Sequence, residues 1–203
     1  MIQKQEIRYD DLIGHSTLLY GETNTKKTII TSKFVQYLIE SKKILPKDIT
    51  ILDFAPPISS IKDIKIGGKI KDFYDKSSIC NNFYFEGEII PPRLKARNKY
   101  ELYKFACENF RKTFNILKKF NNNPTKILII NDISIYLHIG NKKLLVDSIK
   151  ESETFFGNSY YGFSINNNFA AHFNLREKRL VEYLIKKMDY SYSTEILKSY
   201  KSK

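Results

Sequence analysis

The sequence predicts an α/β fold in which a mainly parallel central sheet is flanked by helices. Apolar runs of strand length alternate along the chain with segments whose apolar residues recur at helical spacing. One run, residues 125–132, is almost unbroken, as expected for a strand that is buried on both faces. The chain has 203 residues, of which 42% are hydrophobic, so we expect a single domain over residues 1–203.

The first half of the chain is expected to hold three strands, a helix and a hairpin. A strand at 16–21 ends at a glycine, and a helix over 27–41 has apolar residues at every fourth position. A strand at 48–57 ends in two prolines. Two adjacent glycines, which tolerate the positive φ of a tight turn, indicate a small β-hairpin insertion near 61–73. Residues 79–90 are the third predicted strand.

The second half of the chain is expected to continue the alternation of helix and strand. A long helix at 98–120 carries aromatic and aliphatic residues along one face, as a core helix does. The buried strand at 125–132 follows it. A helix around 141–153, a strand near 154–161 and a helix at 175–189 complete the series, and the last residues are expected to fray.

The chain is strongly basic. Its 34 Lys and Arg residues outnumber 22 Asp and Glu residues, which gives a formal net charge of +12. Such a charge is typical of nucleic-acid binders. However, the lysines form no block, and abundant Lys, Asn, Ile and Tyr also result from an AT-rich coding sequence. We therefore favour a solvated basic surface, and binding to nucleic acid stays an open alternative.

Cysteine content and hydropathy bear on the compartment. Cys80 and Cys107 have no spacing typical of a metal site, which indicates two free thiols, although a disulfide between them stays open. The first residues lack the apolar segment of a signal peptide, and no window is long and apolar enough to cross a bilayer. We expect a cytoplasmic protein without a membrane partner.

Residues 16–38, STLLYGETNTKKTIITSKFVQYL, contain the main functional signal. Gly21 ends an apolar run, Lys27 and Thr28 come six residues later, and a helical pattern follows. This is the layout of a phosphate-binding loop, G-x-x-x-x-G-K-[ST], in which successive backbone N–H groups and a helix N-terminus surround a phosphate. Lys27 would reach the β- and γ-phosphates, and the Thr28 hydroxyl would bind Mg²⁺.

Lys26 departs from this pattern, because the motif has glycine at this position. If the backbone there is left-handed, a side chain costs about 1–2 kcal/mol. We expect weakened nucleotide binding and not its loss, since 1.4 kcal/mol corresponds to about a factor of ten.

Asp132 ends the apolar run KILIIND and supplies a carboxylate where phosphate-loop enzymes hold their metal. Through GETNTKKT and KILIIND, the chain resembles the P-loop NTPase superfamily over most of its length. A GTPase would carry D-x-x-G after this strand and N-K-x-D elsewhere, and neither is present at 132–135, 98–101 or 141–144. Adenine nucleotides are therefore expected.

The distance along the chain between Lys27 and Asp132, about a hundred residues with two predicted strands between them, resembles the RecA-like branch with additional strands. The segment FEGEIIPPRL is similar to a recombinase stretch, E-G-x-x-x-P-x-R-[IL], whose glutamate is the catalytic base. The resemblance implies Glu86 as the base, with Glu88 and Asp53 as further candidates. The alternative for Glu86 is an ordinary surface carboxylate.

Further polar residues are candidates for contact with the γ-phosphate. The resemblance implies a polar sensor after the next strand, at Asn158 or Ser159. Arg176 and Arg179 are three positions apart at a predicted helix start, so they share a face and are candidates for a lid or an arginine finger. A solvated helix face is the favoured reading of this pair. The same two alternatives apply to Arg93 and Arg97.

We therefore expect a single P-loop domain that binds ATP with Mg²⁺ and hydrolyses it slowly. The looser resemblance is to small archaeal P-loop proteins of unassigned function. Lys27, Glu86 and Asp132 are the expected catalytic residues, and Thr28 and Asp132 the metal ligands. The expected nucleotide-binding residues are Gly21, Glu22, Thr23, Asn24, Thr25, Lys26, Lys27, Thr28 and Ile29. A kinase, a nucleotide-sensing module without hydrolysis, a nucleic-acid-binding module and an oligomer stay open.

Overall fold

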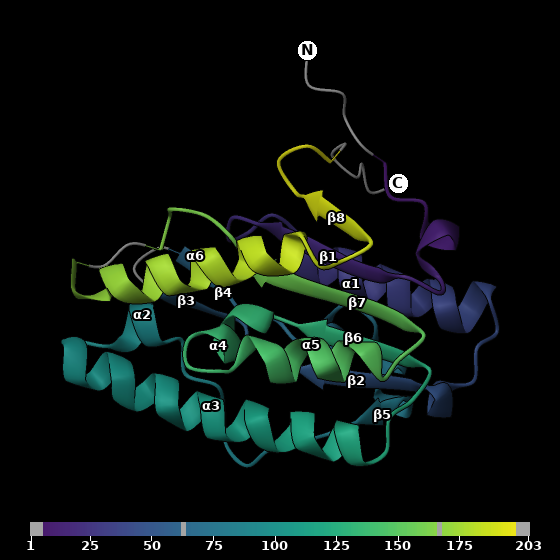
Figure 1. Ribbon diagram of the computed structural model, residues 1–203, viewed down its shortest axis with the longest axis horizontal. Coiled ribbons are helices and arrows are strands. Elements are labelled where there is room, and N and C mark those ends of the chain that lie inside the picture. The colour runs from purple at the N-terminus through teal and green to yellow at the C-terminus, as the bar shows by residue number, and fades with distance from the viewer. Residues whose placement is uncertain (1–5, 62–63, 166–167, 198–203) are drawn as a thin grey trace.

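A parallel sheet forms the centre of the molecule (Figure 1). The structure is a computed structural model that describes residues 6–61, 64–165 and 168–197. In this described part of the chain the sheet has six strands in the order β5-β2-β6-β7-β1-β8, and every neighbouring pair is parallel. The strands are β1 (Ser16–Gly21), β2 (Ile49–Asp53), β5 (Asn81–Asn82), β6 (Ile127–Asn131), β7 (Thr154–Tyr160) and β8 (Tyr190–Ser193).

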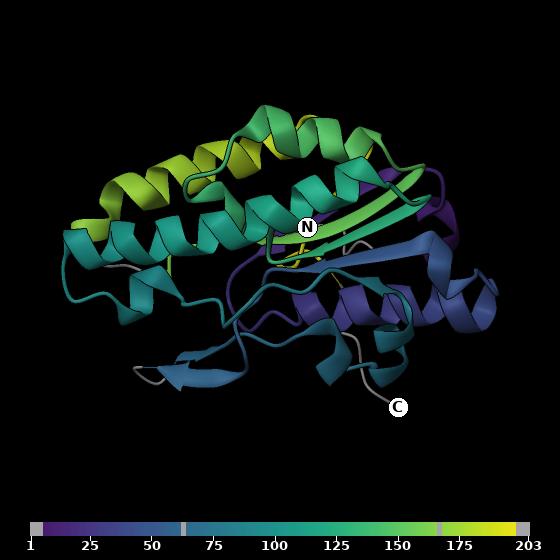
Figure 2. The same cartoon turned by 90° about the horizontal axis from the view of Figure 1, so that it is seen from below.

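Helices cover both faces of the sheet (Figure 2). One face packs against α1 (Lys27–Gln36), which continues as a π-helical turn over Tyr37–Ser41. The other face packs against α3 (Lys99–Asn122), α4 (Ile133–Leu137), α5 (Lys142–Lys150) and α6 (Ala171–Ile185). The short helix α2 (Pro92–Lys95) precedes α3. The predicted α/β fold with helices on a mainly parallel sheet is confirmed.

Strand β6 shows why its sequence is apolar without interruption. Ile127 and Ile129 point into the core on the α1 side, whereas Leu128 and Ile130 point into the core under α3 and α5. Successive side chains of a strand alternate between the two faces, so a central strand of a covered sheet requires apolar residues at every position. The same layer structure brings the carboxyl ends of β1, β6 and β7 to one edge of the sheet.

The predicted hairpin exists, but its strands lie earlier than expected. β3 (Ser59–Ile61) pairs antiparallel with β4 (Ile64–Ile66). Gly67 and Gly68 therefore follow the second strand and do not form the turn. Gly67 has a φ of 78°, and a Cβ there would overlap the carbonyl oxygen of Pro57. The glycine allows two backbone segments to approach closely, which is the other use of this residue.

The prediction of a strand at 79–90 is mostly wrong. Only Asn81–Asn82 forms a strand, β5, at the edge of the sheet. The apolar residues that follow cover α3 instead, with Ile89 buried in the core. The Asn109 side chain on α3 accepts a hydrogen bond from the Ile90 N–H at 3.1 Å and donates one to the Ile90 carbonyl at 2.6 Å. A helix side chain thus satisfies the backbone that a neighbouring strand would have paired.

Other boundaries also differ from the expectation. The strand predicted at 48–57 ends at Asp53, before its two prolines, and the helix predicted at 175–189 spans Ala171–Ile185. The sequence analysis missed α4 and the edge strand β8, whose four residues are only half-buried. Most of the predicted frayed end, residues 198–203, lies outside the described residues. Within the described segments, no helix combines the length and apolar character that crossing a membrane requires.

Candidate functional site

A cavity of about 430 Å³ opens at the carboxyl ends of the central strands. This edge is where open α/β sheets bind their ligands. The predicted phosphate loop, residues 21–28, contributes its later residues to the lining, and Asp132 and Asn158 line the same cavity. Further walls come from the hairpin segment, from α2 and from the start of α4.

The predicted phosphate loop, residues 21–28, has three residues with a positive φ. Gly21 has a φ of 154°, and a Cβ at this position would overlap the Thr194 side chain. Asn24 and Lys26 both have left-handed backbones, with φ values of 59° and 63°. Lys26, the residue immediately before α1, therefore occupies the left-handed position at which the motif has glycine. The strain expected at this residue is present in the chain.

Lys27 folds back over the loop. Its Nζ donates hydrogen bonds to the carbonyl of Gly21 at 2.9 Å, to the carbonyl of Glu22 and to the Thr25 hydroxyl at 3.3 Å. Burial lowers the pKa of the Lys27 ammonium to about 8, although the charges of Asp132 and the nearby glutamates act against this shift. Lys27 thus lies half-buried at the first residue of α1.

A network of side-chain amides connects Thr28 to the strand ends. The Thr28 hydroxyl donates to Oδ1 of Asn131 at 3.2 Å, and Asn158 Nδ2 donates to the same oxygen at 2.8 Å. Nδ2 of Asn131 donates to Oδ1 of Asp53 at 2.8 Å and to the Gly68 carbonyl at 3.0 Å. The residue in contact with the Thr28 hydroxyl is therefore Asn131, one position before the expected Asp132. Sequence reasoning missed Asn131, although its place as the last residue of a buried strand was a usable signal.

Asp132 follows this network directly and has a left-handed backbone, with φ 59° and ψ 61°. Its N–H donates to Oδ1 of Asn158 at 3.1 Å, and its carboxylate accepts a hydrogen bond from the Ser134 hydroxyl. Burial raises the pKa of the Asp132 carboxyl, and the charge of Glu177 acts in the same direction, against the Ser134 hydrogen bond and the charge of Lys27. Lys27, Asp132 and Asn158 are therefore brought together, as the sequence analysis expected.

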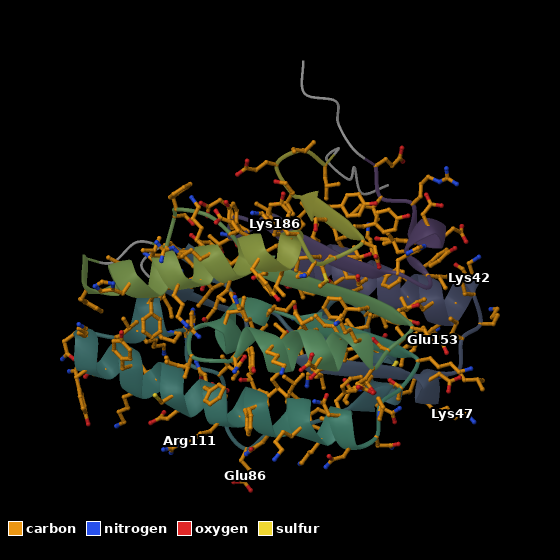
Figure 3. All side chains as sticks on the ribbon, in the orientation of Figure 1. Lys42, Lys47, Glu86, Arg111, Glu153 and Lys186 are labelled. Atoms are coloured by element: carbon orange, nitrogen blue, oxygen red, sulfur yellow. The ribbon has the colours of Figure 1, made fainter. Side chains whose placement is uncertain are left out.

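The other candidate carboxylates lie elsewhere. Glu86 and Glu88 are exposed in the loop between β5 and α2, and Figure 3 shows Glu86 at the lower edge of the molecule, pointing away from it. Among the described residues that line the cavity, neither glutamate is present. Asp53 is half-buried behind Asn131 and accepts the Ile70 N–H at 2.7 Å, so it supports the network. The Ser159 hydroxyl is buried against its own strand.

The candidate arginines Arg176 and Arg179 are absent from the described lining of the cavity. Arg179 is exposed on α6. The guanidinium of Arg176 donates to the carbonyls of His138, Ile139 and Gly140 at 3.1, 3.1 and 2.8 Å. These carbonyls follow the last turn of α4, so Arg176 caps that helix end. Arg179 thus lies on a solvated helix face, as the favoured reading had it, whereas that reading did not predict the contacts of Arg176 with the end of α4.

Arg93 belongs to a buried cluster that we call the Arg93–Glu177–His138 cluster. Oε2 of Glu177 lies 3.0 Å from Nη2 of Arg93 and 2.8 Å from Nε2 of His138. Arg93 is only 7% exposed, Glu177 3% and His138 2%. Arg93 also bonds Asn174 and packs on the Tyr160 ring at 4.8 Å. Sequence reasoning did not identify Glu177 or His138, because no local pattern shows that they meet.

The residues of the cavity fit a magnesium ion only together with a ligand. Within residues 6–61, 64–165 and 168–197, no group of three or more His, Cys, Asp or Glu side chains could hold a metal ion. Magnesium is usually bound by one or two carboxylates and completes its coordination with phosphate oxygens and water. In this cavity the Asp132 carboxylate and the Thr28 hydroxyl are the oxygen ligands that the chain could offer to such an ion.

Comparison of the sequence with known protein families and with curated proteins finds no match in either.

The buried cluster predicts that replacement of Arg93 lowers the free energy of unfolding much more than replacement of the nearby Arg97. Replacement Arg93→Met leaves the Glu177 carboxylate buried without its cation, which typically costs about 3–5 kcal/mol. Arg97→Met is the matched control, because Arg97 forms an exposed pair with Glu101 and should matter little. Urea denaturation measures both free energies of unfolding, and equal losses for the two variants would contradict the role of the cluster.

The left-handed backbone of Lys26 predicts that glycine at this position gives a more stable protein than alanine. Lys26→Ala removes the charge and keeps the strain, whereas Lys26→Gly removes both. We expect the glycine variant to be more stable than the alanine variant by about 1 kcal/mol, since only glycine adopts this conformation freely. The measurement is the urea midpoint at unchanged slope. A more stable alanine variant would show that the backbone is not left-handed.

Proposed function

We propose that the chain binds ATP with Mg²⁺ at this cavity and hydrolyses it slowly. The observation that carries the proposal is the convergence of the phosphate loop, Lys27, Thr28 and Asp132 at one edge of a parallel sheet. The strand order also supports the proposal. Strand β7 is an additional strand that lies between β1, which precedes the phosphate loop, and β6, which precedes Asp132. This order is compatible with a RecA-like P-loop NTPase that forms one domain.

The phosphate tail would lie in the loop before α1. Backbone N–H groups at the start of the ten-residue helix and its dipole favour a negative charge there. The Lys27 ammonium would exchange the carbonyls of Gly21 and Glu22 for phosphate oxygens, which are stronger partners for a cation. The half-buried ammonium is thus already located where the charge of the phosphates would develop.

The metal would be bound by Thr28 and Asp132, together with the phosphates. When bound, Mg²⁺ would neutralise charge that develops on the transferred phosphoryl group. Asp132 is also the carboxylate of the cavity best placed to orient an attacking water, so we assign it the role first expected for Glu86. Asn131, a neutral residue, takes the contact with Thr28. A metal site with one carboxylate is consistent with slow turnover.

The proposal predicts a specific loss of affinity on removal of the Lys27 ammonium. Titration calorimetry with ATP and Mg²⁺ should show micromolar or weaker binding to the native chain and at least about tenfold weaker binding to Lys27→Ala. This loss corresponds to a charge-assisted contact of about 1.5–3 kcal/mol.

Lys119→Ala is the matched control, because Lys119 is exposed on the last turn of α3. Equal affinities of the native chain and Lys27→Ala would refute the site. A phosphate-release assay on the native chain then separates hydrolysis from binding alone, and release without any added acceptor supports the hydrolase.

The lowered pKa of Lys27 predicts that ATP binding weakens at alkaline pH. In the free protein the ammonium loses its proton as the pH rises through about 8, whereas bound phosphates favour the charged form and raise its pKa. Binding above pH 8 must therefore be coupled to proton uptake. Affinity should be nearly constant from pH 6.5 to 7.5 and fall between pH 8 and 9.5.

Calorimetry at pH 9 in buffers of different ionisation enthalpy measures this proton uptake directly. Lys27→Ala should show a smaller uptake than the native chain, because the titrating ammonium is absent. Constant affinity of the native chain up to pH 9.5 would contradict the prediction.

A further inference from the structure

Part of the cavity wall is not used by the nucleotide site described above. His138, at the end of α4, and Arg93, on α2, both line the cavity, and Glu177 on α6 joins them from behind. Ionisable side chains that are more than nine-tenths buried are costly, so their position on a cavity wall calls for a reason. The Arg93–Glu177–His138 cluster is the feature from which we argue.

The hydrogen bond to Glu177 determines how His138 can act. A carboxylate paired with Arg93 only accepts hydrogen bonds, so Nε2 of His138 carries the proton in that contact at 2.8 Å. In the neutral imidazole with its proton on Nε2, Nδ1 has a free lone pair. This atom is buried and has no hydrogen-bond partner among the described residues. A buried acceptor without a donor is rare in folded proteins, and a bound hydroxyl group would satisfy it.

The cluster lies close to the proposed phosphate site. The charge of Glu177 acts on both Lys27 and Asp132. Ser134, which bonds the Asp132 carboxylate, is one helical turn before His138, and both line the cavity. A compound between His138 and the phosphate loop would thus have its hydroxyl near the terminal phosphate.

The remaining lining is suited to a flat apolar group. Pro56, Phe73 and Pro92 contribute rings to the lining, and Ile66 and Leu94 add aliphatic surface. Aromatic groups pack favourably against other rings. The volume of about 430 Å³ lies within the range of small-molecule sites. A nucleoside combines a flat ring system with hydroxyl groups, and it would occupy only the part of this cavity that lies beside the phosphate tail.

We propose that the cavity binds a nucleoside beside ATP and that His138 accepts the proton of its reacting hydroxyl group. This inference rests on the proposed nucleotide site. The hydroxyl oxygen forms a bond to the terminal phosphorus of ATP, the bond from that phosphorus to the bridging oxygen breaks, and ADP leaves. The proton passes to Nδ1 of His138. Glu177 positions the ring and stabilises the imidazolium, and Arg93 holds Glu177 in place.

Access to Nδ1 requires a small rearrangement, because protein atoms cover it in this structure. The Phe173 ring packs on the His138 ring, with 5.5 Å between the ring centroids. A shift of the side chains around His138 on binding would open the atom to the nucleoside, and side-chain rearrangements commonly accompany binding.

The test uses the full chain, Mg²⁺, ATP labelled in its terminal phosphate, and a panel of ribonucleosides and deoxyribonucleosides. We expect label in at least one nucleoside monophosphate. His138→Gln should reduce the transfer rate at saturating substrates by about 100-fold or more, the usual contribution of a general base. The matched control is His172→Gln, which replaces an exposed histidine on α6 and should leave transfer unchanged.

A second measurement does not depend on the folding of a His138 variant. The nitrogen NMR signals of the three histidines are recorded on the native chain with ATP, and variants of His15 and His172 assign the His138 signals by elimination. Addition of the accepted nucleoside should shift the Nδ1 signal of His138.

The outcomes separate the two proposals. If ATP does not bind, the proposed function fails and the nucleoside inference fails with it. If ATP binds and its phosphate is released to water while no nucleoside is labelled, only the nucleoside inference is overturned. Transfer that is unchanged in a folded His138→Gln variant, or an unshifted Nδ1 signal, would overturn the role of His138.

Discussion

The buried side-chain amide of Asn131 connects the parts of the molecule that form the cavity. Its oxygen accepts hydrogen bonds from Thr28 on α1 and Asn158 on β7, and its nitrogen donates to Asp53 at the end of β2 and to the Gly68 carbonyl. All four contacts are made without any exposed surface on Asn131. A fully satisfied buried amide fixes its partners in position, because any shift leaves a polar group without a partner. The start of α1 and the ends of β2, β6 and β7 are therefore held in one arrangement, and the positions of Lys27 and Asp132 follow from it.

The charges around the cavity complement one another in the absence of a ligand. The Lys27 ammonium lies on backbone carbonyls of the phosphate loop, and the charges of Asp132 and Glu177 favour its protonated form against the effect of burial. The buried Glu177 carboxylate is in turn paired with Arg93. A triphosphate with its metal would add negative charge next to Lys27 and positive charge next to Asp132, so each group would exchange a weaker partner for a stronger one. Under the proposed function, a ligand of this kind would therefore complement the charges of the cavity.

The fold, and the placement of residues 21–28 and Asp132 at one edge of the sheet, could be predicted from the sequence because they depend on local patterns. Strands such as β1, β6 and β7 are buried by helices on both faces, and burial requires the apolar runs that identify them. Edge elements such as β5 and β8 carry no such requirement and were missed or misjudged. Among the candidate site residues, Asp132 directly follows β6 and Lys27 begins the helix after β1, so topology alone brings them to one edge. The meeting of Arg93, His138 and Glu177 could not be predicted, since it depends on how α2, α4 and α6 pack in space.

The phosphate loop contains a glutamate, Glu22, that ought to repel phosphate, and the structure explains how the loop accommodates it. The Glu22 carboxylate accepts hydrogen bonds from the N–H groups of Phe163 and Ser164 and from the Ser164 hydroxyl. Burial raises the pKa of this carboxyl, but these hydrogen bonds outweigh that effect and lower it overall. Gly162 makes the contact possible, because a Cβ there would overlap the carboxylate. The Glu22 carboxylate is therefore held by the segment after β7, although its charge still acts on Lys27 at the start of α1. The same bonds tie that segment to the phosphate loop, so neither can move without the other unless Glu22 loses its partners.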